Sequence, residues 1–436
     1  MASETTTSRP RVFYGWFIVS AGGAVQFLIS ATYWRGFQAF FDPIVTTFGW
    51  SRGATAAAVS LQRLEGGILS PFVGPLILRY GPRKVMLLGI AVTGSSFVIM
   101  SHITALWQFY GAMALLTFGM SLGTFIVLVS TVSNWFIKRR ARAVAILMSF
   151  SALGGLTVPI LVTSIDSFGW RDVLMMIGIA IWVVGFPSAM VMRRAPEHYG
   201  QKPDGESSDA ENIGLPRSTG SLLSDPNLGV RQVLKTRFFW QFALAGSLGR
   251  MASAASVLHL PALRDSGVSP GLAALAVGML SVGDLIGRMS VGWIGDRVDK
   301  RWFLAGSYSL MGVGILALAL VNSELLDASW LRFTPLPIFV VGFGVGFGIS
   351  VPLRFTMLAD YVGRRSFASL LGLTGTVGEI FAASGPIFVG LTYDITGSYR
   401  PAFFILAAAI TVAVPLSFSL ERPAVVMAKV RARTFD

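Results

Sequence analysis

One short stretch of the chain is Gly74-Pro-Leu-Ile-Leu-Arg79-Tyr-Gly81-Pro-Arg83-Lys84, and it lies between two long apolar blocks. A similar stretch, Gly292-Trp-Ile-Gly-Asp296-Arg297-Val-Asp-Lys300-Arg301, lies between two other apolar blocks in the second half of the chain. Short basic loops between long apolar blocks are typical of proteins that cross the membrane repeatedly. The recurrence of the loop indicates two related halves.

The composition points to the same class of protein. Of the 436 residues, 53% are hydrophobic, only 13% are charged and none is cysteine. A soluble chain carries about 25% charged residues, so the charged side chains here are too few to cover a water-facing surface. The sequence predicts an integral membrane protein and excludes a soluble enzyme, a disulfide scaffold and a nucleic-acid binder. The net charge of +13 lies mainly in loops, where it is an orientation signal.

Apolar blocks long enough to cross a membrane recur along the chain. A spanning helix needs about 20 predominantly apolar residues, and each block ends at charged residues or at Pro and Gly clusters. We therefore expect an all-α integral membrane fold of twelve transmembrane helices in two pseudo-symmetric six-helix bundles. The predicted helices are 13–33, 53–78, 85–103, 106–133, 142–164, 171–191, 238–263, 271–295, 302–322, 335–360, 367–391 and 399–420.

One long hydrophilic stretch divides these helices into two sets of six. It runs from Arg193 to Arg237 and is rich in Ser, Pro, Gly, Asp and Glu, a composition typical of flexible linkers. We expect an N-terminal half over 1–192 and a cytoplasmic linker over 193–237. The C-terminal half, 238–436, should end in a short basic tail.

The distribution of basic residues predicts the orientation. With a cytoplasmic N-terminus, 25 of the 35 Lys and Arg residues fall on the cytoplasmic side, 4 fall inside predicted helices and 6 fall on the opposite side. Those six are Arg35, Arg52, Arg171, Arg264, Arg332 and Arg400. Because basic loops stay in the cytoplasm, we expect both termini there, with the protein in the plasma (inner) membrane.

A second loop also recurs. Trp135-Phe-Ile-Lys138-Arg139-Arg140-Ala-Arg-Ala follows the fourth predicted helix, and Tyr361-Val-Gly-Arg364-Arg365-Ser-Phe-Ala follows the tenth. Two six-helix repeats with a site at the midplane between them are typical of alternating-access transporters. Together with the loop at 74–84, this pattern resembles the major facilitator superfamily over essentially the whole chain.

The resemblance implies a gating role for both copies of the first loop. Gly74 and Arg79 match the family's loop signature in the first copy, and Asp296 and Arg297 match it in the second. The acidic residue of this signature is thought to help latch the halves together on the cytoplasmic side. The first copy has Leu78 at that position, so only the second copy carries the acidic group.

Further motifs resemble the monocarboxylate transporter-like group and its bacterial relatives. They are Phe48-Gly-Trp-Ser-Arg52, Trp135-Phe with its basic run, Phe168-Gly-Trp-Arg171, Gly385-Pro386, Tyr393-Asp394-Ile-Thr-Gly397-Ser-Tyr-Arg400 and Asp284-Leu-Ile-Gly-Arg288. The resemblance implies that Asp284 and Arg288 form the substrate-anion and proton-coupling pair. The oxalate:formate antiporters share many of these features.

Ionisable side chains inside predicted helices are the main candidates for function. Each costs roughly 2.5 to 3.5 kcal/mol or more in hydrocarbon, so it usually faces a cavity or a partner. Asp284 and Arg288 are four residues apart and share a helical face. Arg288 can grip a carboxylate with its planar fork, while Asp284 can hold that arginine between turnovers or take a proton. A purely structural ion pair is the alternative.

Two residues of the seventh predicted helix are further candidates. His259 has an ordinary pKa of about 6.5, which suits proton transfer, and the resemblance implies a histidine near the bound carboxylate. The alternative is a structural residue close to a helix end. Arg250 is a second substrate anchor, a partner of Glu379, or an arginine that extends toward the cytoplasm.

The remaining charges are expected to be gating or structural residues. Arg63 and Glu65 are two residues apart, so each needs a partner on another helix. Arg354 and Glu379 are expected in ion pairs between helices. Asp42 stands where related animal carriers typically have a lysine for proton relay, so we expect a residue at a helix end or turn instead.

The balance of charges favours an anionic substrate. Four arginines stand against three carboxylates inside the predicted helices, which leaves one positive charge when histidine is neutral. An uncompensated buried charge is expensive, so this favours a bound anion. The expected aromatic lining is Tyr33, Trp34, Phe37 and Phe125. One cation in an apolar cavity fits a small monocarboxylate better than a sugar or a dianion.

No cofactor or metal is expected. The sequence has no G-x-x-x-x-G-K-[ST] and no H-E-x-x-H, and its three histidines are scattered. We expect a monomeric secondary transporter that carries a small organic anion by proton-coupled monocarboxylate symport. Its partners are the anion, protons and the lipid bilayer. Anion exchange of the oxalate:formate type, a non-transporting sensor and drug efflux are the alternatives, and a membrane enzyme is the least supported class.

Overall fold

The computed structural model describes residues 13–136, 140–199, 230–295, 297–322 and 333–432. These described residues are helical almost throughout and include no strand. The all-α fold predicted from the sequence is confirmed.

The helices of the first half follow the predicted order. They are α1 (Tyr14–Ile29), a π-helical turn (Ser30–Trp34), α2 (Gln38–Phe48), α3 (Arg52–Tyr80), α4 (Pro82–Ser101), α5 (Leu106–Gly123), α6 (Phe125–Trp135), α7 (Arg140–Gly154), α8 (Val158–Phe168) and α9 (Trp170–Val191). Short non-helical or 3-10 breaks separate α5 from α6 and α7 from α8, so each pair forms one bent rod.

The second half begins after the predicted linker. Its helices are α10 (Val230–Leu234), α11 (Arg237–Ala254), α12 (His259–Asp265), α13 (Pro270–Ile294), α14 (Lys300–Leu320), α15 (Pro335–Thr396), α16 (Arg400–Phe418) and α17 (Pro423–Ala432). A 3-10 turn at Ala255–Leu258 joins α11 to α12. The helical assignment of α15 is continuous, but it contains two separate candidate spans, Pro335–Val362 and Leu370–Thr396.

Ten helical segments of the described residues are long and apolar enough to cross a membrane. The first is the whole run Tyr14–Phe48, and the last is Arg400–Phe418. Two of the expected helices are not among them: α3 carries Arg63 and Glu65, and the α11–α12 run carries Arg250 and His259. The predicted membrane class is confirmed, and the number of twelve stays a prediction.

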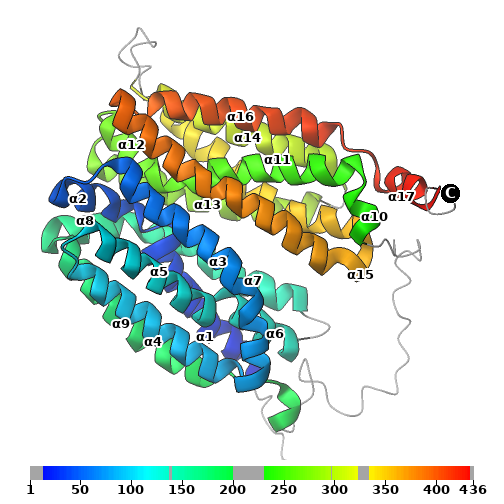
Figure 1. Ribbon diagram of the computed structural model, residues 1–436, viewed down its shortest axis with the longest axis horizontal. Helices are drawn as coiled ribbons and strands as arrows, with labels where there is room; N and C mark the ends of the chain where they lie inside the picture. Colours follow the sequence, from blue (N-terminus) through cyan, green and yellow to red (C-terminus); the bar gives the residue numbers. More distant parts are fainter. Residues whose placement is uncertain (1–12, 137–139, 200–229, 296, 323–332, 433–436) are drawn as a thin grey trace, which may run out of the picture.

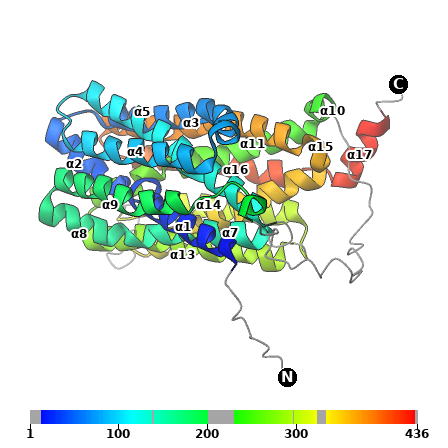
Figure 2. The same ribbon diagram turned by 90° about the horizontal axis from the view of Figure 1, so that it is seen from below.

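The helices form two bundles that lie side by side (Figure 1). Helices α1–α9 make one bundle and α10–α17 make the other, and all the long helices run roughly along the long axis in both views (Figures 1 and 2). The bundles meet where α3 packs on α15, where α7 and α8 pack on α13, and where α2 packs on α12. The boundaries at 192 and 237 stay predictions.

The long helices end at two opposite ends of the molecule, which we call the outer end and the inner end. The outer end holds the connections from α2 to α3 and from α12 to α13, at the left of Figure 1. The inner end holds the start of α1, in the lower middle of Figure 1, and the end of α16, at the right. All the predicted cytoplasmic loops that the structure describes lie at the inner end.

The first helix differs from its predicted limits. The sequence placed its end near Tyr33 and counted Arg35 with the loops, but the helical rod continues to Phe48. The rod bends at the π-helical turn, where the backbone N–H of Arg35 donates to the carbonyl of Ser30 at 2.9 Å. Arg35 therefore lies in the middle of a spanning segment, which corrects its assignment to a loop.

Close helix contact fixes the position of α13 against α15. A Cβ atom on Gly348 would lie 2.2 Å from the backbone oxygen of Asp284, and one on Gly283 would lie 3.0 Å from the backbone of Gly344. Only glycine allows two backbones to come this near. The backbone of Asp284 is thereby held against α15.

Candidate functional site

The most prominent polar contact between the two bundles is a carboxylate shared by two arginines. Asp284 Oδ1 accepts from Arg288 Nε at 2.7 Å, and its Oδ2 accepts from Arg35 Nη2 at 2.8 Å and from Arg288 Nη2 at 3.2 Å. The Asp284 side chain is 2% exposed, while Arg35 and Arg288 are 16% and 30% exposed. We call these three residues the central triad.

The local sequence explains how the central triad forms. Arg288 follows Asp284 by one helical turn, as the predicted pairing required. Arg35 comes from the other bundle, directly after the π-helical turn, and its guanidinium carbon lies 5.3 Å from the ring centre of Phe347 on α15. Such turns inside α-helices often occur at functional sites.

Arg35 is the functional candidate that sequence reasoning missed. Its predicted position in a loop rested on its charge. Apolar residues resume at Phe37 and continue, interrupted by Gln38 and Asp42, as far as Val45, and this was the signal that the helix does not end at Tyr33. A charged residue between two apolar segments can lie inside a transmembrane helix when an oppositely charged residue on another helix pairs with it.

The central triad lies on the wall of a cavity of about 250 Å³. Both bundles contribute to its lining, which is Ser30, Trp34, Arg35, Arg63, Ser151, Ser253, Ser256, Asp284, Arg288, Phe343 and Phe347. The guanidinium groups of Arg35 and Arg288 are thus within reach of a small solute in this cavity.

A second cavity of about 310 Å³ lies mainly within the first bundle. It is lined by Trp34, Gln62, Arg63, Thr117, Met120, Ser121, Thr124, Phe125, Ile126 and Glu379. Trp34 and Arg63 line both cavities, so the two adjoin. The predicted substrate residue Phe125 lies here, at the start of α6, with 54% of its surface exposed.

Tyr33 is placed differently from Phe125. It is buried beside the π-helical turn and packs against Trp34 and Phe37. Its role in binding substrate stays a prediction.

Of the three environments that the sequence left open for Arg250, the structure shows the ion pair with Glu379. Its Nη1 donates to Glu379 Oε1 at 2.5 Å, so α11 and α15 are joined by this ion pair. Glu379 also reaches the wall of the second cavity. Substrate binding by Arg250 stays a prediction.

Arg354 does not form the expected ion pair with another helix. Within the part of the chain that the structure describes, its Nη1 donates to the carbonyl of Gly246 at 3.0 Å and its Nε donates to the carbonyl of Ser350 at 3.2 Å. The guanidinium reaches the carbonyl on α11 because Gly246 has no side chain, and the Arg354 side chain lies directly against it.

His259 is enclosed by aromatic rings. Phe339, Phe343 and Phe403 lie 4.9–5.8 Å from it, measured between ring centres, and the side chain is 1% exposed. Neither ring nitrogen has a hydrogen-bond partner among the described residues. Its predicted roles with substrate and proton stay predictions.

Arg63 and Glu65 have different neighbours. Arg63 lines the two cavities, and Glu65 lies by Thr117 on α5, which lines the second cavity. Their gating or structural roles stay predictions.

The predicted latch residues lie at the inner end or outside the described residues. Gly74 and Arg79 belong to the end of α3, where Arg79 is exposed above the ring of Tyr80. Arg297 is exposed in the turn after α13, and Asp296 lies outside the described residues. The gating role of all four stays a prediction.

The loop after α13 is held within its own bundle. Lys300 Nζ donates to Asp360 at 2.8 Å, and Arg301 donates both to Asp299 at 2.6 Å and to the carbonyl of Leu420 at 2.6 Å. The hydrogen bond from Arg301 holds the pKa of the Asp299 carboxyl below its usual range.

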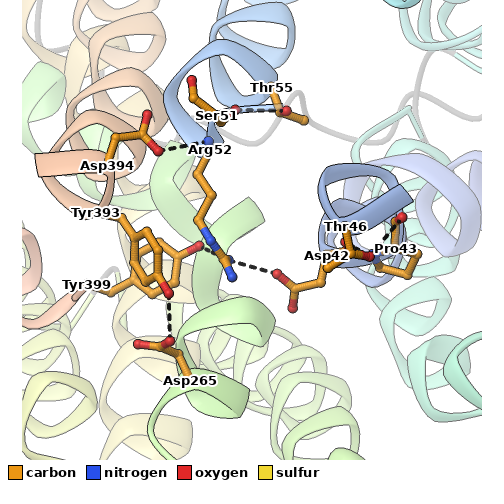
Figure 3. Close-up of polar contacts among 10 residues, drawn as sticks. All are labelled: Asp42, Pro43, Thr46, Ser51, Arg52, Thr55, Asp265, Tyr393, Asp394 and Tyr399. Atoms are coloured by element: carbon orange, nitrogen blue, oxygen red, sulfur yellow. Dashed lines mark hydrogen bonds and ion pairs between the residues drawn. The ribbon is translucent and has the colours of Figure 1, made fainter. Parts of the chain in front are cut away.

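A second polar contact between the bundles lies at the outer end (Figure 3). Arg52, the first residue of α3, donates from Nη1 to Asp42 Oδ1 at 2.8 Å and to the hydroxyl of Tyr399. Its guanidinium carbon lies 4.2 Å from the ring centre of Tyr393, whose hydroxyl donates to Asp265 at 2.9 Å.

Asp394 completes this contact. Its two carboxylate oxygens accept from the backbone N–H groups of Arg52 and Gly53 at 2.9 and 2.8 Å, so a residue of the second bundle caps the N-terminus of a helix in the first. We call the six residues Asp42, Arg52, Asp265, Tyr393, Asp394 and Tyr399 the outer cluster.

The outer cluster corrects the expectation for Asp42. The residue lies inside α2, not at a helix end or turn, and it pairs with Arg52. The left-handed Gly49 ends α2 seven residues later and brings Arg52 back toward Asp42. The motifs at 48–52 and 393–400, which lie far apart in the sequence, meet here.

The described residues include no group of three or more His, Cys, Asp or Glu side chains that could hold a metal ion. The central triad itself consists of arginine and carboxylate groups, which can bind an anion and exchange a proton.

Comparison with known proteins identifies the family. The model of the Major Facilitator Superfamily matches residues 23–265 and 248–433. Monocarboxylate transporter 11 of Mus musculus is 28% identical over 399 residues, which cover 91% of this chain and 85% of that protein. The uncharacterized MFS-type transporter YcxA of Bacillus subtilis (strain 168) is 24% identical over 400 residues, covering 89% of this chain and 90% of that protein.

A solved structure confirms the fold. The crystal structure of a point mutant of the nucleoside transporter NupG matches with a TM-score of 0.73 and 10% sequence identity, over 94% of this chain and all of that chain. The chain therefore belongs to the Major Facilitator Superfamily, and within it is related to the monocarboxylate transporters.

Proposed function

We propose that the protein carries small organic carboxylates across the membrane by alternating access, with the central triad as the binding site. One observation carries this proposal: the buried carboxylate of Asp284 is gripped by an arginine from each bundle at the wall of a cavity. A substrate carboxylate has the same shape and charge as the group that these arginines already bind. It can therefore take over one or both of them.

Substrate binding at this place would couple the two bundles. Arg35 belongs to the first bundle and Arg288 to the second, so a carboxylate held by both arginines bridges the halves. Rocking of one bundle against the other around such a bridge is how transporters with two related halves expose a midplane site to alternate sides.

Asp284 gives a route for proton coupling. Two arginines and one carboxylate carry one net positive charge, which a bound monocarboxylate neutralises. The arginines are then shared between two carboxylates, and protonation of Asp284 frees them for the substrate. We propose that a proton and the anion travel together, that both termini are cytoplasmic, and that the protein acts as a monomer in the plasma membrane.

The relationship to monocarboxylate transporters supports this substrate class. Phe343 lines the central cavity, and His259 packs behind it. We propose that His259 affects substrate binding by positioning the ring of Phe343. The proposed substrate contacts are Arg35 and Arg288 first, with Phe125 and Arg250 more distant.

Uptake into proteoliposomes tests the proposal. Purified protein is compared with Arg288→Gln and Arg35→Gln, using radiolabelled lactate and butyrate with and without an inward proton gradient. Arg231→Gln, at an exposed arginine of α10, is the matched control. We expect gradient-stimulated uptake in the wild type and the control, and at least a tenfold loss in both triad variants.

Two other outcomes have clear meanings. Uptake that ignores the gradient but needs preloaded anion would replace symport by exchange. Uptake that survives both triad substitutions would exclude the central triad as the binding site.

A further inference from the structure

The second cavity holds polar atoms that nothing in the described part of the protein satisfies. Gln62 is 5% exposed and its Oε1 has no hydrogen-bond partner among the described residues, and the same holds for the buried Nε of Arg63. Both residues line this cavity. Buried polar groups are nearly always paired, and each unpaired one costs free energy. Two such atoms from neighbouring residues at one cavity wall indicate a place for a polar ligand.

Arg63 forms no ion pair with any of the described residues. Glu379 lines the same cavity but is bound to Arg250. The hydroxyl groups of Thr117 and Thr124 donate to the carbonyls of Met113 and Met120 in their own helices. Arg63 is therefore the cation that this wall presents to an incoming anion.

Two positive charges border the two cavities. The central triad combines two arginines with one carboxylate and so carries one of them, and Arg63, which forms no ion pair among the described residues, carries the other. An anionic group beside each charge would balance them.

The two cavities are arranged to receive one molecule with two acidic ends. Arg63 and Trp34 line both of them, with Arg35 and Arg288 on the wall of the first and Gln62 on the wall of the second. The exposed indole of Trp34 offers an apolar surface between the two polar regions. The amide of Gln62 can turn either its oxygen or its NH₂ group to the ligand, so it can donate to a second carboxylate.

We propose that Gln62 and Arg63 form a second anion subsite and that the favoured substrate is a small dicarboxylate. One carboxylate binds Arg35 and Arg288, and the other binds Arg63. This inference rests on the proposed function, because it takes the central triad as the first subsite, and it makes Arg63 the residue that sets specificity.

A pair of four-carbon acids tests the inference. Succinate and butyrate have the same number of carbons but two carboxylates and one, respectively. Their radiolabelled uptake is measured in proteoliposomes of the wild type, Arg63→Gln, Arg63→Lys and Gln62→Leu. We expect the wild type to favour succinate at least tenfold. Arg63→Gln should lower the ratio of succinate uptake to butyrate uptake at least tenfold, because it removes the charge that only the second carboxylate uses.

Two further variants distinguish the effect of the Arg63 charge from the effect of its shape and of its neighbour Gln62. Arg63→Lys keeps the charge without the planar fork, so it should retain part of the preference for succinate. Gln62→Leu should lower succinate uptake by less than Arg63→Gln does. A wild type that carries butyrate and not succinate would overturn the inference. An Arg63→Gln variant that loses both acids by the same factor, without rescue by lysine, would also overturn it.

Failure of the inference is distinguishable from failure of the proposed function. If Arg288→Gln abolishes uptake of both acids while Arg63→Gln does not discriminate between them, only the second subsite is wrong. If Arg288→Gln changes neither uptake, or if the wild type carries neither acid, the proposed function fails and the inference fails with it.

Discussion

Two arginine-centred contacts join the bundles, and they are built differently. In the central triad, Asp284 is almost completely buried and both of its partners are side chains of arginine. In the outer cluster, Arg52 lies against two tyrosine rings, and the carboxylate of Asp394 binds backbone N–H groups.

This difference indicates that the central triad binds the ligand and that the outer cluster holds the outer ends of the two bundles together. A substrate carboxylate can replace Asp284 as the partner of the two arginines, since the chemical group is the same. In the outer cluster a small anion could replace only the Asp42 carboxylate, because the other contacts join a tyrosine hydroxyl, tyrosine rings and a helix N-terminus at fixed positions on the two bundles. We infer that a ligand acts at the central triad and that the outer cluster holds the outer ends of the bundles together.

The largest effect is expected from Asp284→Asn. The substitution leaves Arg35 and Arg288 close together without their shared carboxylate, and breaking a buried pair in this way typically costs about 3–5 kcal/mol. We expect a lower melting temperature and loss of gradient-driven uptake. The double variant with Arg35→Gln should recover part of the melting temperature, because it removes one of the unpaired charges. Unchanged stability of the single variant would contradict the assigned pairing.

A smaller effect is expected from Arg52→Gln, which breaks the contacts to Asp42 and Tyr399. The halves should then separate more often at the outer end. Because the chain has no cysteine, a single Ser256→Cys in the central cavity can report on access. We expect a membrane-impermeant maleimide added at the outer face to label it about tenfold faster in the Arg52 variant, since about 1.4 kcal/mol of lost contact shifts a population tenfold.

The matched control for this labelling is Arg171→Gln. Arg171 lies at the same end and stacks on Trp170, but it donates to the carbonyl of Ile103 within its own bundle. Its removal should leave the labelling rate unchanged. Equal acceleration in both variants would mean that loss of any outer arginine loosens the protein, and the outer cluster would lose its assigned role.

Asp394→Asn should have a still smaller effect on the same labelling. The asparagine keeps one oxygen to accept from the N-terminus of α3 but loses the negative charge there. A charge at a helix N-terminus contributes about 0.3–1 kcal/mol, so we expect the labelling rate to rise by less than fivefold. A rise larger than that of Arg52→Gln would make the helix cap the main contact of the outer cluster.

The sequence predicted the fold and two of the three residues of the central triad. Apolar blocks and recurring loops are local signals, and so is the four-residue spacing of Asp284 and Arg288. Arg35 was missed because its partner lies on another helix, in the other bundle. The same reason explains Arg354, whose partner on α11 is the backbone carbonyl of Gly246. Patterns along one helix do not reveal which backbone comes close enough to pair with it.

The outer cluster also could not be predicted from the sequence, because it forms between two motifs that lie far apart in the chain. The stretches at 48–52 and 393–400 were noticed as similar to a family, but nothing in their spacing showed that they meet. Left-handed glycines at 49 and 397 end α2 and α15, and the stretches meet through Arg52, Asp394 and Tyr399. The charge of Asp42 gave a signal for pairing, and its partner lay ten residues later, beyond the turn.

The smallest effect is expected from His259→Phe, at a residue that belongs to neither contact. His259 shares α12 with Asp265 of the outer cluster, and Phe343 separates it from the central cavity. Because its nitrogens have no partner among the described residues, a phenyl ring loses no hydrogen bond there and fits the surrounding aromatic side chains. We expect uptake within about twofold of the wild type and unchanged stimulation by the proton gradient, since Asp284 carries the proton in our proposal. If gradient stimulation disappears while exchange persists, the proton passes through His259, and the aromatic enclosure is its path between the outer cluster and the central triad.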